Sequence, residues 1–279
     1  MKMSFGIVGG DRRQAELARL LAEDQHSVIT FGLSGWGAPT AESIEEVAGA
    51  DVVILPLPLC KGVGVLNCEE YPMTTLELFR RLRSEQKIFA GRVLPQQQEE
   101  AERYGLNLED YFLREELAVA NAAATAEAAI QVAMQQLERT LLGMECLVLG
   151  FGRIGKLLSH RLAGMGARVT VTARRPEDLE WIRAYGFNAE KTGELNGKLT
   201  SYGIVFNTVP NPVLGAQLLA QLKPGCLCVD LASEQGIDLA AAESLGVPNL
   251  WARSLPGQFL PYTAAEAIRN AVYHILSEG

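Results

Sequence analysis

The stretch from Leu147 to Arg175 constrains the fold more than any other part of the chain, and it reads LVLGFGRIGKLLSHRLAGMGARVTVTARR. An apolar run typical of a buried strand leads into Gly150, Gly152 and Gly155, which follow the spacing G-x-G-x-x-G and open a helical segment. Such glycines permit a tight turn, let a pyrophosphate approach the backbone and let the helix pack closely on the strand. The stretch predicts a βαβ unit that binds a dinucleotide at the helix N-terminus. An α/β sheet that has lost its nucleotide is the alternative.

The strand that follows these glycines ends on Ala173, Arg174 and Arg175. Proteins that hold NAD usually have Asp or Glu at the place of Ala173, where the carboxylate binds the adenosine ribose. Loss of this carboxylate removes repulsion against a 2′-phosphate, and two guanidinium groups can donate paired hydrogen bonds to that phosphate. We therefore expect NADP rather than NAD, with two solvated surface arginines as the alternative interpretation.

Two later strand ends complete the predicted cofactor site. The stretches NTVPN, residues 207–211, and DLAS, residues 230–233, each follow an apolar strand-like run. Ligands bind outside the carboxyl ends of strands in open parallel sheets, although either stretch could be an ordinary turn. The predicted cofactor-binding residues are Gly150, Phe151, Gly152, Arg153, Ile154, Gly155, Ala173, Arg174, Arg175, Asn207, Thr208, Val209, Pro210, Leu231 and Ala232.

Strand-like and helix-like segments alternate along the chain, which predicts parallel sheets joined by crossover helices. A length of 279 residues suits two domains. We expect an α/β protein with two Rossmann-like, doubly wound parallel-sheet domains and a cleft between them. The expected order is a substrate domain over 1–120, a connecting helix over 121–143, an NADP-binding domain over 144–260 and a terminal helix over 261–279 that packs back on the first domain.

Charge and composition exclude several other classes of protein. The net charge of −8 argues against general binding to nucleic acid or to anionic membranes. No apolar run approaches the roughly 20 residues of a membrane span, and no secretory signal pattern is present. The cysteines and histidines lack the spacing of metal ligands. We expect a cytoplasmic protein without a bound metal.

A second glycine turn, GGDRRQ over residues 9–14, lies between a strand and a helix of the first domain but lacks the full dinucleotide pattern. Its arginines and the helix N-terminus could hold a carboxylate, or the segment could be a plain turn with solvated arginines. The three histidines, His26, His160 and His274, are not placed to act together with a carboxylate as a catalytic base. A dinucleotide site and an anion-holding turn together describe a dehydrogenase of a small acid whose chemistry needs little help from a base.

Several motifs in this order resemble the A-subunit family of dipicolinate synthase: GGDRRQ, FLREELAVANAAATAEAAI, LGFGRIG, NTVP, DLAS and SLPGQFLPYTA. The resemblance covers nearly the whole chain. LGFGRIG is common to many dehydrogenases, whereas GGDRRQ, TAEAAI and the SLPG ending in combination are more specific. The chain departs from the family at Ala128, where glycine is frequent, and at Tyr262 and Ala265 in the P-K-T-A-G ending.

The resemblance implies oxidation of dihydrodipicolinate, formed from the product of dihydrodipicolinate synthase, to dipicolinate with hydride transfer to NADP. It also implies that the partner is a flavoprotein-like B subunit, and that the location is the mother-cell cytoplasm of a sporulating bacterium. We further expect a homo-oligomer. Oxidation of a dihydropyridine gives an aromatic ring, so the enzyme's main task is to orient a good hydride donor.

The two carboxylates of such a substrate require two anion sites. We expect Arg13 and the adjoining helix N-terminus to hold one, and either the 121–125 segment or the 254–257 loop to hold the other. Polar contact or proton removal could come from Thr125, Glu127 or Thr263. The predicted catalytic residues are Arg13, Thr125 and Glu127, and the predicted substrate-binding residues are Gly10, Asp11, Arg13, Asn121, Ser254, Pro256, Gly257 and Thr263.

Two other functions stay open at this point. One is a different NAD(P)-dependent two-domain dehydrogenase that acts on an amino acid or a hydroxy acid. The other is a regulatory or scaffolding protein that binds NADPH without turnover.

Overall fold

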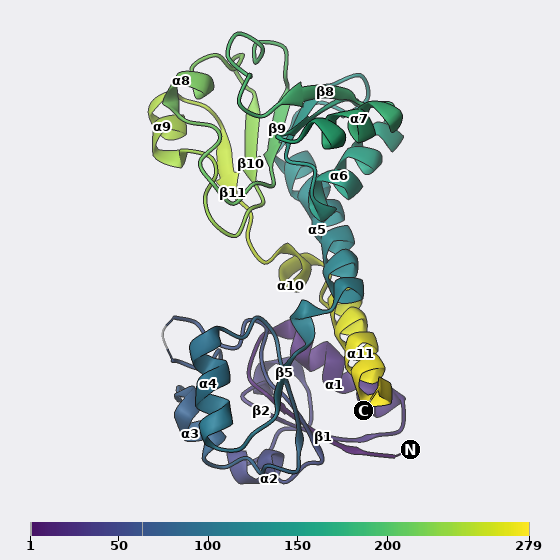
Figure 1. The fold of residues 1–279 in the computed structure, drawn as a ribbon, viewed down its shortest axis with the longest axis vertical. Coiled ribbons are helices and arrows are strands. Elements are labelled where there is room, and N and C mark those ends of the chain that lie inside the picture. The colour runs from purple at the N-terminus through teal and green to yellow at the C-terminus, as the bar shows by residue number, and fades with distance from the viewer. Residues whose placement is uncertain (1, 63, 279) are drawn as a thin grey trace. The chain divides into compact units, whose positions relative to one another are not determined.

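The computed structural model describes residues 2–62 and 64–278 and divides into two compact units. Unit 1 comprises Met1–Asn121 and Pro256–Gly279, and unit 2 comprises Ala122–Leu255 (Figure 1). The second boundary lies at Leu255, a few residues before the expected position of 260. The last segment of the chain therefore returns to unit 1.

Unit 1 is built on a five-stranded parallel sheet whose strand order is β2-β1-β3-β4-β5. This is the flavodoxin-like order, in which the chain reverses its direction of winding between β1 and β3. The strands are β1 Ser4–Val8, β2 Ser27–Phe31, β3 Val52–Ile54, β4 Lys87–Ala90 and β5 Leu108–Asp110. The helices are α1 Arg12–Glu23, α2 Ile44–Ala48, α3 Thr75–Phe79, α4 Pro95–Arg103, α10 Leu255–Phe259 and α11 Pro261–Glu278, with the 3₁₀ turns η1 Ser34–Trp36 and η2 Tyr111–Leu113.

Helices cover both faces of this sheet. On one face, Leu17 and Leu21 of α1 and Ile268 and Val272 of α11 join a buried cluster with Ile7 of β1. The helices α1 and α11 lie side by side in Figure 1. Helical spacing of the apolar residues places them on one side of each helix, so both helices bury that side against the sheet.

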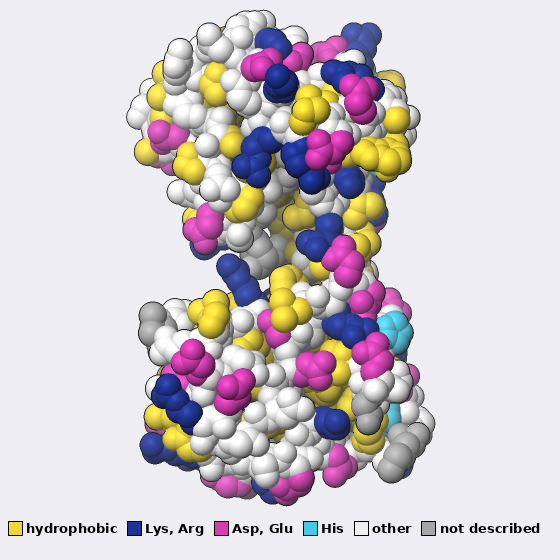
Figure 2. Space-filling model, in the orientation of Figure 1, with side chains coloured by type: hydrophobic (Ala, Val, Ile, Leu, Met, Phe, Trp, Pro, Cys, Tyr) yellow, Lys and Arg dark blue, Asp and Glu magenta, His cyan; other side chains and the backbone are white. Residues whose placement is uncertain are grey.

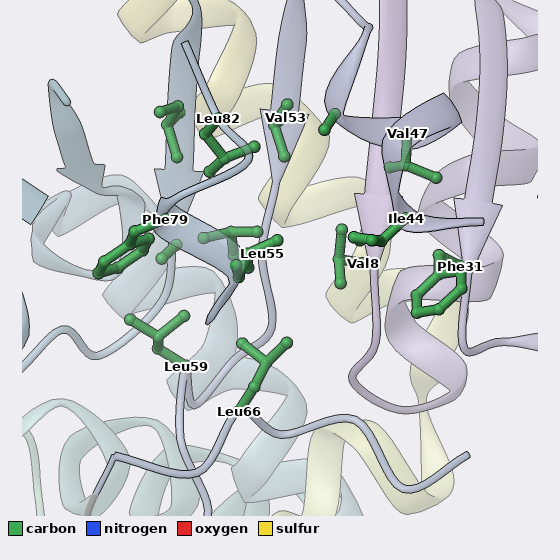
Figure 3. Packing of buried hydrophobic residues seen from close by; sticks show 14 of the residues in the cluster. Val8, Phe31, Ile44, Val47, Val53, Leu55, Leu59, Leu66, Phe79 and Leu82 are labelled. Atoms are coloured by element: carbon green, nitrogen blue, oxygen red, sulfur yellow. The ribbon is translucent and has the colours of Figure 1, made fainter. Parts of the chain in front are cut away.

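The other face of the sheet carries α2, α3 and α4. Figure 3 shows Val47 of α2 and Phe79 of α3 in one buried cluster with the strand residues Val8 and Val53. These side chains are almost fully buried. Because both faces are covered, the strands read as continuous apolar runs rather than as alternating patterns.

Unit 2 contains a six-stranded parallel sheet with the order β11-β10-β9-β6-β7-β8, which is the usual Rossmann order. The chain reverses its direction of winding between β6 and β9. The strands are β6 Glu145–Leu149, β7 Arg168–Ala173, β8 Asn188–Lys191, β9 Ile204–Asn207, β10 Leu227–Asp230 and β11 Asn249–Trp251. The helices are α5 Glu115–Gln136, α6 Arg153–Gly164, α7 Pro176–Ala184, α8 Ala216–Leu219 and α9 Leu239–Ser244. The parallel α/β architecture predicted for both halves of the chain is confirmed.

The connecting helix α5 begins earlier and ends earlier than the expected 121–143. Glu115 and Glu116 occupy its first turn, where carboxylates interact favourably with the helix dipole. After Gln136 the chain forms a turn in which the Gly143 N–H donates to the Gly166 carbonyl at 2.8 Å, so this segment cannot continue the helix. The boundary between the units, Asn121 to Ala122, falls inside α5.

Helix α5 is rich in alanine, and among the described residues it is the one helix long and apolar enough to cross a membrane by length and composition. Half of its most apolar window is buried inside the protein. The core helix of a soluble protein has the same properties, so this is weak support for a membrane span.

Candidate functional site

The glycine turn of unit 2 lies at the point where the sheet reverses its winding. Gly150 directly follows β6 and has a φ of 100°, a backbone conformation that residues with a side chain rarely adopt. A Cβ atom there would lie 2.5 Å from the Thr208 hydroxyl oxygen. Thr208 is fixed in turn, because its hydroxyl and its N–H both donate to the Leu149 carbonyl at 2.9 Å. The carboxyl ends of β6 and β9 therefore meet at the place where open α/β sheets bind ligands.

The two later glycines of this turn have different tasks. A Cβ atom on Gly155 would lie 2.1 Å from the Gly150 carbonyl oxygen, so only glycine lets α6 pack this closely on β6. Gly152 is the N-cap of α6, is exposed, and has open space where a Cβ would point. Glycine offers no capping side chain, which leaves the first N–H groups of the helix to bind an anion. This geometry fits the pyrophosphate of a dinucleotide.

A buried pair of side chains holds the two neighbouring loops. Asn207 and Asp230 are fully buried, and the Asn207 amide donates to the Asp230 carboxylate at 2.8 Å. Asp230 also accepts from the N–H groups of Ala232, Gly236 and Ile237 at 2.8 to 3.0 Å. Because the Asn207 side chain is occupied inside the protein, it shapes the loop; its predicted cofactor contact is restricted to its backbone.

Of the other predicted cofactor residues in these loops, Thr208 and Val209 are half-buried and Pro210 is exposed. Leu231 and Ala232 are buried. Sequence analysis missed Thr172, whose hydroxyl accepts from the Gly150 N–H at 3.3 Å, and the organising role of Asp230. The signal for Asp230 was a polar side chain at the end of an otherwise apolar strand.

The strand end that should bind the ribose carries no carboxylate. Ala173 is buried, and both Arg174 and Arg175 are exposed. Arg175 donates to the Asp178 carboxylate at 2.8 and 3.1 Å, whereas Arg174 makes no hydrogen bond or ion pair with the residues that the structure describes. Figure 2 shows acidic and basic side chains interspersed over the face of unit 2 that carries α6, α7 and β8. Any phosphate selectivity at this strand end thus depends on individual arginines, Arg174 first.

The glycine turn of unit 1 begins a well-capped helix. The Asp11 carboxylate accepts from the Arg13 N–H at 3.0 Å, and the Gln14 side chain accepts from the Asp11 N–H at 3.1 Å, which forms a capping box. Gly10 has a φ of 97°, and a Cβ there would lie 2.5 Å from the Gln14 side-chain oxygen. The cap already satisfies part of the helix N-terminus that was expected to hold a substrate carboxylate.

The Arg13 side chain is buried, with 6% of the residue exposed, and is bound on two sides. Its Nε and Nη2 donate to the Asp11 carboxylate at 2.9 and 2.8 Å, and Nη2 also donates to the Leu57 carbonyl at 2.6 Å. Gly257 packs on this ion pair, since a Cβ there would lie 2.9 Å from the Arg13 Nε. Burial raises the Asp11 pKa, but the contacts with Arg13 outweigh burial and hold it below its usual value. Arg13 therefore joins three segments of unit 1, and only its Nη1 edge is left for the predicted contact with substrate.

The remaining predicted residues are distributed over both units. Thr125 is buried on α5 in unit 2, and Asn121, on the same helix, belongs to unit 1. Ser254 is exposed and has a φ of 54°, and Thr263 is exposed on α11. Pro256 is buried in α10.

Glu127, a predicted catalytic residue, is part of an ion pair. Its carboxylate accepts from the Arg161 Nε and Nη2 at 3.1 and 2.9 Å. This ion pair connects α5 to α6. The catalytic role of Glu127 stays a prediction. In the part of the chain that the structure describes, no three or more His, Cys, Asp or Glu side chains are grouped so as to hold a metal.

Comparison with known proteins agrees with this geometry. The family model of the D-isomer specific 2-hydroxyacid dehydrogenase NAD binding domain matches residues 114–242. The model of the N-terminal domain of the dipicolinate synthase A subunit matches residues 4–112. The fold and the site thus define a dehydrogenase-type oxidoreductase whose unit 2 binds a nicotinamide dinucleotide.

The relatives specify the family. The dipicolinate synthase A subunit of Bacillus subtilis is 30% identical over 286 residues, which cover 99% of this chain and 96% of the relative. The crystal structure of the A subunit from Bacillus halodurans superposes with a TM-score of 0.88 at 25% identity and covers 99% of this chain and 98% of its own. The crystal structure from Bacillus subtilis superposes with a TM-score of 0.85 at 30% identity, over 100% and 97%. The chain belongs to the A-subunit family of dipicolinate synthase, which confirms the resemblance seen in its motifs.

Proposed function

We propose that this chain oxidises dihydrodipicolinate to dipicolinate and transfers the hydride to NADP⁺. One hydride leaves a ring carbon and one proton is released, so that the ring becomes aromatic. The observation that carries the proposal is membership of the family over nearly the whole chain. The dinucleotide geometry at Gly150, Gly152 and Gly155 supports it. Dehydration of the dihydrodipicolinate synthase product, where it is needed, precedes the hydride transfer.

In this proposal, unit 2 holds the cofactor. The N-terminus of α6 would bind the pyrophosphate, Arg174 the 2′-phosphate, and the 207–211 loop would lie beside the nicotinamide ribose. Bound NADP⁺ supplies the hydride acceptor. The preference for NADP is supported by the alanine at position 173 and by the neighbouring Arg174 guanidinium, which has no partner among the described residues.

Unit 1 would hold the diacid. A dihydropyridine becomes aromatic when it loses hydride, so orientation of the ring and exclusion of water contribute more than a strong base does. The turn at Gly10, Asp11 and Arg13 would fix this part of the site, and the ion pair between Asp11 and the buried Arg13 keeps the turn rigid. The released proton would pass to solvent or to Glu127, the predicted acceptor, whose carboxylate is paired with Arg161.

The relatives are named for the first of two or more subunits, and this name supports the presence of a partner protein. We propose that the dipicolinate synthase B subunit fills this role, that the chain forms a homo-oligomer and that it works in the mother-cell cytoplasm of a sporulating bacterium. A soluble enzyme without contact to nucleic acid or membranes is part of the same proposal.

The test is a coupled assay with the purified chain. Dihydrodipicolinate is generated in the cuvette by dihydrodipicolinate synthase, and the rise of the NADPH absorbance band is followed with and without the B subunit. Formation of dipicolinate is checked by mass spectrometry. We expect NADPH and dipicolinate in equal amounts, and faster turnover with NADP⁺ than with NAD⁺.

Two outcomes would contradict the proposal and favour another function. Faster turnover of L-alanine or of 2-hydroxy acids than of dihydrodipicolinate would indicate another dehydrogenase of small acids. Measured binding of NADPH without turnover of any substrate, whether or not the B subunit is present, would indicate a regulatory protein.

A further inference from the structure

Unit 1 contains a pocket of about 290 Å³ at the carboxyl ends of β3 and β4. Pro58 and Cys60, which follow β3, line one part, and Arg92 and Leu94, which follow β4, line another. Its volume lies near the lower end of the range for small-molecule pockets, about 300–1,000 Å³. The pocket therefore suits a single small ring compound and is too small for a dinucleotide. No predicted site residue lines it.

Arg92 is exposed and lines this pocket. Its φ of 56° lies in the left-handed region, which an arginine rarely adopts. The Asp110 carboxylate stabilises this conformation by accepting from the Arg92 N–H at 3.0 Å and from the Val93 N–H at 2.8 Å. The guanidinium itself makes no hydrogen bond or ion pair with the residues that the structure describes.

Two other arginines of unit 1, one in the turn after α3 and one on α4, have acidic partners. Arg81 pairs with Glu45 at 3.1 Å, and Arg103, on α4, lies 3.8 Å from Glu99. Arg92 thus stands out as a pocket-lining cation to which the described residues supply no partner. A carboxylate is the ligand that matches its planar, two-pronged donor edge.

The rest of the lining sets the orientation of a ligand. Leu94 and Pro58 offer carbon surfaces, against which a planar ring can pack. Glu100 also lines the pocket, where its carboxylate accepts from the Thr75 hydroxyl at 3.1 Å. An acid ligand would turn its carboxylate toward Arg92 and away from Glu100, since like charges repel.

We propose that this pocket binds the pyridine or dihydropyridine dicarboxylate, with Arg92 holding one of its two carboxylates. This inference rests on the proposed function and names a residue that substrate recognition needs. The second carboxylate is left for the Gly10 to Arg13 turn, which is connected to the pocket through Leu57 and Pro58: Leu57 accepts from Arg13, and Pro58 lines the pocket.

Dipicolinate itself is the probe for a binding test by titration calorimetry on the full chain. Arg92→Gln should weaken dipicolinate binding tenfold or more, Arg92→Lys should weaken it less, and Arg103→Gln on α4 serves as the matched control with no effect. Glu100→Gln should leave the affinity unchanged or raise it. The affinity for NADPH should be the same in all four variants.

A labelling experiment locates the ligand. Cys60 is the half-buried thiol of this chain, and the other four are buried. Burial, with a contribution from Glu100, raises the Cys60 pKa to about 11, so alkylation will be slow and is followed at alkaline pH by peptide mass spectrometry. Dipicolinate should slow the alkylation of Cys60 in the wild type and have no effect in Arg92→Gln.

The outcomes separate this inference from the proposed function. If the wild type turns over dihydrodipicolinate and Arg92→Gln keeps the wild-type kcat/KM and dipicolinate affinity, the pocket assignment is wrong and the reaction stands. If the wild type binds dipicolinate, and dipicolinate protects Cys60 from alkylation, but no turnover is seen, then the proposed reaction is wrong and the pocket assignment is supported. A wild type that does not bind dipicolinate overturns the pocket assignment.

Discussion

At the scale of single residues, the structure distinguishes the two arginines that the sequence placed together. Arg175 is already paired with Asp178, and Arg174 has no partner among the described residues. Arg174→Gln should therefore weaken NADPH binding about tenfold or more, because hydrogen bonds to charged groups contribute about 1.5–3 kcal/mol. NADH binding should stay unchanged, and Arg175→Gln should have a smaller effect on NADPH. Fluorescence titration of both dinucleotides measures this, and equal losses for NADPH and NADH would rule out a 2′-phosphate site.

Asp11 gives a second prediction at this scale. Its pKa is lowered in the folded protein, so its contribution to stability is present above its unfolded pKa, about 3.9, and is lost as the pH falls through the folded value. Asp11→Asn keeps a side chain that caps helices well but cannot be protonated. The variant should lose less stability than the wild type between pH 7 and pH 3, as measured by the urea midpoint of unfolding. Identical acid dependence would show that the Asp11–Arg13 pair is not a source of acid sensitivity.

The sequence revealed the residue types of the site better than their partners. The spacing of Gly150, Gly152 and Gly155 follows from backbone geometry, which a motif records. The burial of Arg13 against Leu57 and Gly257 depends on segments far apart in the sequence, and a motif cannot record such contacts. For the same reason, the sequence did not show that Glu127 is paired with Arg161.

At the scale of elements, the junction of β6 and α6 offers a matched pair of glycines. Gly155→Ala places a Cβ against the Gly150 carbonyl and should destabilise the protein by about 1–3 kcal/mol, the usual range for overpacking. Gly152→Ala meets open space within the protein and should cost less stability than Gly155→Ala, because alanine is only a poorer N-cap residue than glycine. The new methyl group should nevertheless weaken NADPH binding, because it occupies the approach of the pyrophosphate. Thermal unfolding and NADPH titration are measured on both variants, and a larger loss of stability in Gly152→Ala than in Gly155→Ala, with normal NADPH affinity, would contradict the assignment.

Element types were predictable, and some element ends were not. The apolar runs and the glycine turns indicated parallel strands and crossover helices, which the structure contains. The end of α5 was placed too late, because the alanine-rich composition of residues 122–136 gave no sign of the turn that follows. The hydrogen bond between Gly143 and Gly166, which fixes that turn, joins two elements that are distant in the sequence.

At the scale of the whole molecule, the two units should respond to different ligands. NADP⁺ should slow hydrogen exchange most strongly in unit 2, at residues 150–155 and 207–211. A ligand at 100 times its dissociation constant stabilises a protein by about 2.7 kcal/mol, which is enough to detect by thermal shift. Hydrogen exchange of the wild type with and without NADP⁺ is the measurement, and Gly152→Ala is the control that should show weaker protection. If protection from exchange were strongest within residues 2–62, the cofactor would bind to unit 1, and its assignment to unit 2 would be wrong.

The buried Asp230 carboxylate is surrounded by Asn207 and three backbone donors. This arrangement should affect the rate at which a cofactor binds. Loops held by such a network have little freedom to lose, so this part of the proposed cofactor site is ordered before a cofactor binds. Association should then be fast and free of a slow ordering phase in stopped-flow traces. Heat released on binding would come from new contacts rather than from the folding of loops.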